Sequence, residues 1–106
     1  MPLSLPVFIL GSASFYAVAM IALKILGQGG PKVAVAFVIA ATVFGGLWME
    51  FEALKSERLG LIYVAILGAE CLIIALASSL LFGESFSTRE LAGGALIVGG
   101  IALALV

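Results

Sequence analysis

Four long stretches of the sequence carry almost no charge. They cover residues 3–26, 33–49, 59–82 and 91–106, and their charged residues are Lys24 and Glu70. A helix needs about 20 apolar residues to cross roughly 30 Å of hydrocarbon. Charged residues make up 10% of the chain, whereas a soluble domain has about 25%. The sequence therefore predicts an all-α integral membrane protein whose surroundings are the lipid bilayer.

Short segments that favour turns separate these stretches. The segment Gly27–Pro31 is rich in Gly and Pro, which end helices, and residues 50–58 and 83–86 form the other two breaks. Ser87 and Glu90 have the spacing of a capping box at the start of the last helix. Short loops make sequential helices antiparallel neighbours. We predict a single four-transmembrane-helix bundle with short loops, with helices at approximately 3–26, 32–50, 59–82 and 88–106.

The composition excludes several classes of function. The chain has no His and no Asp, so the common zinc sites and catalytic triads cannot be built, and we expect no metal and no cofactor. A net charge of −1 leaves no basic face for a nucleic acid. No nucleophile–base pair is visible, so we do not expect an enzyme or a catalytic residue. A minimal chain with four spans suggests a bacterial inner membrane.

Glu70 lies near the middle of the third stretch. A charge at that depth costs at least about 2.5–3.5 kcal/mol, so carboxylates within a membrane face a partner, a cavity or a proton path. Two interpretations stay open: Glu70 binds a proton or a ligand, or it pairs structurally with a neighbouring helix or subunit. Cys71 beside it is expected to be a buried apolar residue. Glu50, near the end of the second helix, is expected to be solvated.

Two further patterns concern aromatic and hydroxyl side chains. Tyr63 lies seven residues before Glu70 on the same helix face, so its hydroxyl and ring are available to a cation there. Ser12 and Tyr16 are four residues apart and share a face of the first helix. Hydroxyls in membrane helices bond their own backbone, hold helices together or line a polar cavity.

The last helix carries a stripe of small residues. Gly93 and Gly100 are seven residues apart, and Ala104 follows four residues later. Helices in lipid associate through small residues that let two backbones approach closely. Two interpretations are open, an oligomer interface and packing within one four-helix unit. Because four short helices have little interior of their own, we favour an oligomer interface at Gly93, Gly100 and Ala104.

The C-terminal half resembles the small multidrug resistance family, within the drug/metabolite transporter superfamily. The segment 81–84 (Leu-Phe-Gly-Glu) and the glycine-rich segment 93–101 are similar to the motifs of that family's last helices. Lys24 resembles a lysine near the end of the family's first helix, and Tyr63 falls on a third-helix tyrosine that lies near substrate. The resemblance implies four spans and export of small cationic or amphipathic compounds in exchange for protons.

The chain departs from that family at its central site. The family's first helix carries an essential glutamate, and Tyr16 stands in its place here. The family's third-helix tryptophan would fall near Ile66, and it is absent from this chain. The usual exchange site is therefore absent. Three hypotheses follow. In the first, Glu70 exchanges protons for a cation, Tyr63 and Tyr16 contact the substrate, and two copies enclose one site. In the second, the chain pairs with a small membrane protein that supplies the glutamate. In the third, it is a non-transporting subunit of a larger membrane complex.

Overall fold

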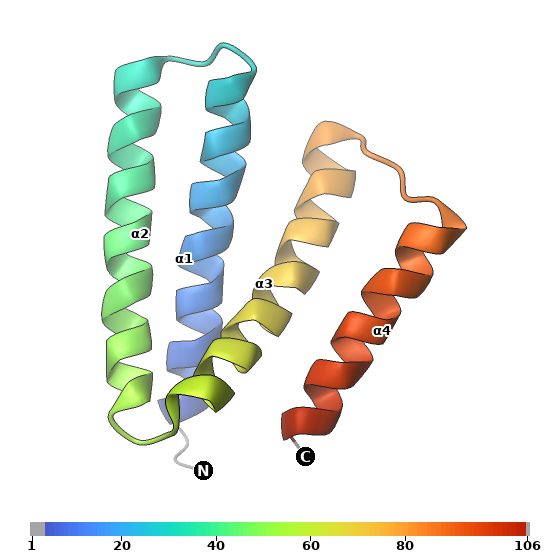
Figure 1. Ribbon diagram of the computed structural model, residues 1–106. Helices are drawn as coiled ribbons and strands as arrows, with labels where there is room; N and C mark the ends of the chain where they lie inside the picture. The colour runs from blue at the N-terminus through green and yellow to red at the C-terminus, as the bar shows by residue number, and fades with distance from the viewer. Residues whose placement is uncertain (1–3, 106) are drawn as a thin grey trace.

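The computed structural model describes residues 4–105, which form four helices. These are α1 (Ser4–Gly27), α2 (Lys32–Leu54), α3 (Leu59–Phe82) and α4 (Thr88–Leu105). α1 and α2 lie side by side, α3 tilts away from them, and α4 runs back beside α3 (Figure 1). The helices α1, α2 and α3 are long and apolar enough to cross a membrane. The prediction of an all-α chain is confirmed for the described residues.

The predicted turns and cap explain where the helices begin and end. Gly29 and Gly83 have φ of 92° and 64°, a left-handed conformation that glycine adopts without a steric penalty. The Ser87 backbone N–H donates to Glu90 Oε1 at 3.0 Å, and the Glu90 N–H donates to Ser87 Oγ at 3.1 Å. This reciprocal pair is the predicted capping box. α2 differs from its predicted range, because it continues past residue 50 to Leu54.

α1 is the centre of the packing. It holds more buried residues than any other helix, and they are largely small: Leu5, Ser12, Ala13, Ala17, Ala19 and Ala22. α1 packs against α2 on one side and against α3 on the other, whereas α2 and α3 make few contacts. We expected every sequential pair of helices to be close neighbours, but α2 and α3 contact each other little. Each packs instead against small residues of α1.

Two consecutive glycines bring α2 onto α1. A Cβ atom at Gly46 would lie 2.8 Å from Tyr16 Cε1, and one at Gly45 would lie 3.1 Å from the Phe15 ring. The buried Ser12 hydroxyl donates to the Gly46 carbonyl oxygen at 2.8 Å. Small residues that allow this approach, together with a hydrogen bond between helices, are what holds helices together in an apolar solvent.

α4 is the least packed helix. Its described side chains are exposed except for Val98 and Ile101, which are half-buried. It meets α3 where Ile101 packs on Gly68, at which a Cβ atom would lie 2.7 Å from Ile101 Cγ2. The molecule measures 42 × 35 × 18 Å, and a helix with its side chains is about 10–12 Å wide. The four helices therefore form an open, flattened bundle with little interior.

The two serines of α1 allow a matched test of the α1–α2 contact. We expect Ser12→Ala to lower the free energy of unfolding by about 0.6–1.7 kcal/mol, because it removes a hydrogen bond between helices. Ser14→Ala should change it little, because the Ser14 hydroxyl bonds its own helix at Leu10 and is exposed. Denaturant titration followed by circular dichroism measures both values. Equal losses would mean that the Ser12 bond does not hold the helices together.

Candidate functional site

Glu70 lines a hollow that runs along α3 toward the α3–α4 connection. The hollow has a volume of about 360 Å³, and its lining comes mostly from α3, with Glu84 and Phe86 from the connection. Glu70 is half-buried. Within residues 4–105 its side chain makes no hydrogen bond and no ion pair. The carboxyl group is thus partly withdrawn into an apolar surface without a partner among these residues.

The neighbouring Cys71 does not behave as expected. It is exposed, and it lines the Glu70 hollow as well as a larger hollow of about 540 Å³ between α3 and α4. The expectation of a buried apolar residue is wrong for this chain, because α4 is splayed from α3 and leaves that face of α3 uncovered.

A second carboxylate lies between α1 and α2. The Tyr16 hydroxyl donates to Glu50 Oε1 at 2.7 Å, and both residues are half-buried. Side chains on a helix lean toward its N-terminus. Because α1 and α2 run in opposite directions, Tyr16 and Glu50 lean toward each other across the Ser12–Gly46 contact. The expectation that Glu50 is solvated at a helix end is wrong, since α2 continues beyond it and turns its side chain toward α1.

The structure does not bring the three predicted site residues into one pocket. Tyr16 bonds Glu50 and does not line the Glu70 hollow. Tyr63 is 55% exposed and does not line the Glu70 hollow. The hollow extends from Glu70 toward Ser78 and Glu84, which is the opposite direction along α3. Within one chain, Tyr63 therefore shares a helix face with Glu70 but not a pocket.

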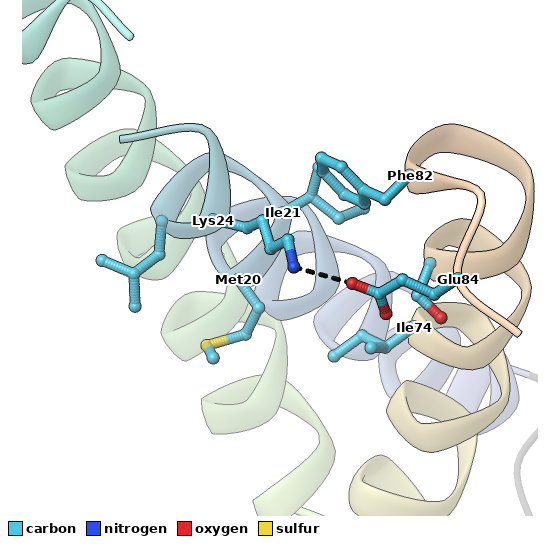
Figure 2. A pocket seen from close by; sticks show the side chains of 8 residues that line it. Met20, Ile21, Lys24, Ile74, Phe82 and Glu84 are labelled. Atoms are coloured by element: carbon cyan, nitrogen blue, oxygen red, sulfur yellow. Dashed lines mark hydrogen bonds and ion pairs between the residues drawn. The ribbon is translucent and has the colours of Figure 1, made fainter. Parts of the chain in front are cut away.

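An ion pair that the sequence did not reveal joins α1 to the α3–α4 connection. Lys24 Nζ lies 2.7 Å from Glu84 Oε2 and 5.4 Å from the centre of the Phe82 ring. The pair lies over an apolar hollow of about 330 Å³ between α1 and α3 (Figure 2). The sequence held one indication of this pair, because the predicted helix ends place both residues at the same end of the bundle.

The predicted interface residues of α4 are exposed among the described residues. A Cβ atom added at Gly93 or Gly100 would meet no atom within 4 Å, and Ala104 is exposed. Close packing within the four-helix unit therefore does not explain the two glycines. An oligomer interface at this stripe stays a prediction.

Comparisons with protein-family models, curated proteins and solved structures give no match to this chain. The residues and their geometry therefore carry the functional argument.

The two tyrosines near the candidate site provide a second matched test. We expect Tyr16→Phe to lower the free energy of unfolding by about 1–2 kcal/mol, because Glu50 loses its hydrogen-bond donor while staying half-buried. Tyr63→Phe should change it by less than about 0.5 kcal/mol, because the Tyr63 side chain is exposed and its hydroxyl makes no hydrogen bond within residues 4–105. Denaturant titration measures both. If Tyr16→Phe lowers the free energy of unfolding no more than Tyr63→Phe does, the Tyr16–Glu50 hydrogen bond does not stabilise the fold.

Proposed function

We propose that this chain is a subunit of a small multidrug resistance-like transporter in a bacterial cytoplasmic membrane. It exports a small cationic or amphipathic compound in exchange for protons, as a homodimer or as half of a heteromeric pair. Glu70 is the exchange group and takes up a proton or the cation in turn. The observation that carries this proposal is the Glu70 carboxyl, half-buried on an apolar helix and without a partner in the described chain.

The surroundings of Glu70 suit a carboxyl that exchanges its partner. One negative charge in an apolar site is compensated equally by a proton or by one cation. A structural carboxyl would instead keep a fixed hydrogen bond, as Glu50 does with Tyr16. Phe86 adds an aromatic ring to the lining, and aromatic rings attract organic cations. An amphipathic cation therefore fits this hollow better than a neutral polar molecule.

The contact between Tyr16 and Glu50 bears on the missing first-helix glutamate. Tyr16 occupies the place of that acid, and its hydroxyl holds a carboxylate that comes from α2. In the proposed transporter the acid absent from α1 is thus supplied from neighbouring helices, with Glu50 held in place and Glu70 free to exchange.

Proton release tests the role of Glu70. We expect the detergent-purified protein, in weakly buffered solution with a pH-sensitive dye, to release protons when tetraphenylphosphonium is added. Glu70→Gln should abolish the release, because the amide holds no exchangeable carboxyl proton. Glu52→Gln is the matched control and should keep it, because Glu52 lies in the last turn of α2, in an ion pair of 3.0 Å with Lys55. Full release by the Glu70→Gln protein would disprove the proposal.

The oligomer is supported by the uncovered surface of α4. Two copies in contact along the stripe of Gly93, Gly100 and Ala104 would bury a face that no helix of the same chain covers. Glycines allow close helix contact in lipid. Helical periodicity places the stripe on a different face of α4 from Ile101, which contacts Gly68 of α3.

Cross-linking tests this interface. We expect Gly93→Leu combined with Gly100→Leu to reduce the yield of cross-linked oligomer severalfold, because leucine side chains separate the two backbones. Neither leucine meets an atom of its own chain at Cβ, so the fold should be kept. Ala92→Leu combined with Gly99→Leu has the same spacing on another face of α4 and should leave the yield unchanged. An unaltered oligomer in the first variant would exclude this stripe as the interface.

The exposed α4 also favours the alternative function, a non-transporting accessory subunit of a larger membrane complex. In that case the face of α4 is covered by other proteins rather than by a second copy. Mild purification distinguishes the two: a transporter subunit purifies as a small oligomer, and an accessory subunit purifies with larger proteins and keeps them in the Glu70→Gln variant.

A further inference from the structure

The Lys24–Glu84 pair spans the mouth of an apolar hollow. α1 and α3 lie close at the end that holds the N-terminus and diverge toward the opposite end (Figure 1). The hollow of about 330 Å³ lies where they diverge, with Met20 and Ile21 from α1 and Ile74 from α3 among its lining. Lys24 reaches across from α1 toward Glu84, and Phe82 lies beside the lysine (Figure 2). The polar contact is thus placed at the edge of an apolar space.

The Lys24 ammonium is held by two groups that recognise organic cations. A carboxylate oxygen of Glu84 lies 2.7 Å from it, and the centre of the Phe82 ring lies 5.4 Å from it. A ring within about 6 Å attracts a cation electrostatically. The side chains of Lys24 and Glu84 are 44% and 40% exposed, and exposed ion pairs contribute little stability. The lysine therefore occupies a complete cation site from which it can be displaced at small cost.

The other end of the molecule shows what the hollow adds. Lys55 Nζ lies 3.0 Å from Glu52 and 4.9 Å from the centre of the Phe51 ring. All three of those residues belong to the end of α2 and its cap, and they line neither the Lys24 hollow nor the Glu70 hollow. The charge chemistry is the same at both ends, and an apolar hollow lies beneath the Lys24 group.

We propose that Glu84 and Phe82 form a binding site for a primary alkylammonium compound, which Lys24 occupies until the ligand displaces it. The ligand ammonium takes the place of Lys24 Nζ, and its alkyl chain enters the hollow between α1 and α3. A primary ammonium is the class of choice because the present occupant is one, attached to an alkyl stem. The exchange replaces one cation with another and moves no proton. The site therefore stands without the proton exchange proposed for Glu70.

Calorimetric titration with n-hexylammonium chloride tests this site. The protein is held in detergent micelles, and titrations into protein-free micelles are subtracted. We expect wild-type protein to bind n-hexylammonium more tightly than n-hexanol, which has the same chain and no charge. Lys24→Met, which keeps a stem of the same length and removes the competing ammonium, should raise the affinity about two- to fivefold, as expected for an exposed ion pair. Glu84→Gln should abolish the preference for the ammonium over the alcohol.

The opposite signs of the two variants separate a ligand site from a structural ion pair. A purely structural pair predicts that Lys24→Met and Glu84→Gln both leave affinity unchanged or both weaken it. Lys55→Met removes the same charge from the matched group and should leave the affinity unchanged, which excludes a general effect of net charge. An unchanged or weakened affinity in Lys24→Met would overturn the proposal. If Lys24→Met does not fold, the n-hexylammonium affinities of Glu84→Gln and Glu52→Gln are compared instead. Equal affinities of these two variants would overturn the proposal.

The Glu70→Gln protein keeps this inference distinct from the proposed function. Combined with Lys24→Met, it should leave the two- to fivefold gain in n-hexylammonium affinity intact, because that gain arises in a hollow that Glu70 does not line. Loss of the gain in the double variant would show that the ligand sits in the Glu70 hollow instead. Failure of the tetraphenylphosphonium proton release, with the Lys24→Met gain intact, would remove the proposed transport role and leave the ammonium site standing.

Discussion

The close contact between α1 and α2 is the interaction on which the arrangement of the chain depends. Apolar side chains gain little by leaving lipid for each other, so helices there need close backbone approach and hydrogen bonds. Gly46 supplies the approach, and the Ser12 hydroxyl supplies the bond at 2.8 Å. Because α1 carries alanines on its other side as well, it also accepts α3. The remaining helix finds no equivalent surface and stays at the edge.

This uneven packing determines which carboxyl groups have a fixed partner and which lie beside an open hollow. Where α1 meets α2 tightly, the carboxylate of Glu50 has a fixed partner in Tyr16. Where α3 leaves α1 and α4 leaves α3, apolar hollows remain, and Glu70 and the Lys24–Glu84 pair lie along them. A carboxyl with a fixed donor is structural, whereas one at the edge of an open hollow can change partner. The proposed roles of Glu50 and Glu70 follow from that difference in packing rather than from their positions along the apolar stretches of the sequence.

The sequence predicted the elements of the fold well and their packing poorly. Long apolar stretches, the two loop glycines and the Ser87–Glu90 pair define helix ends by local rules, so four helices could be located closely. Which faces meet depends on contacts between distant residues, so the contribution of Gly46 and the pairing of Tyr16 with Glu50 were missed. Glu50 was misjudged because α2 does not stop where the charges begin. Glu70 could be singled out as a candidate because an acid within an apolar stretch is conspicuous in the sequence itself.

The central claim is that the Glu70 carboxyl holds a proton and that a cation can take the place of this proton. Infrared difference spectroscopy of the purified protein tests it directly, because a protonated carboxyl has a C=O stretch that a carboxylate lacks. The account predicts that an added organic cation removes a protonated-carboxyl signal, and that this signal is absent from the Glu70→Gln protein. A signal that the cation leaves unchanged, or one that persists in Glu70→Gln, would contradict it.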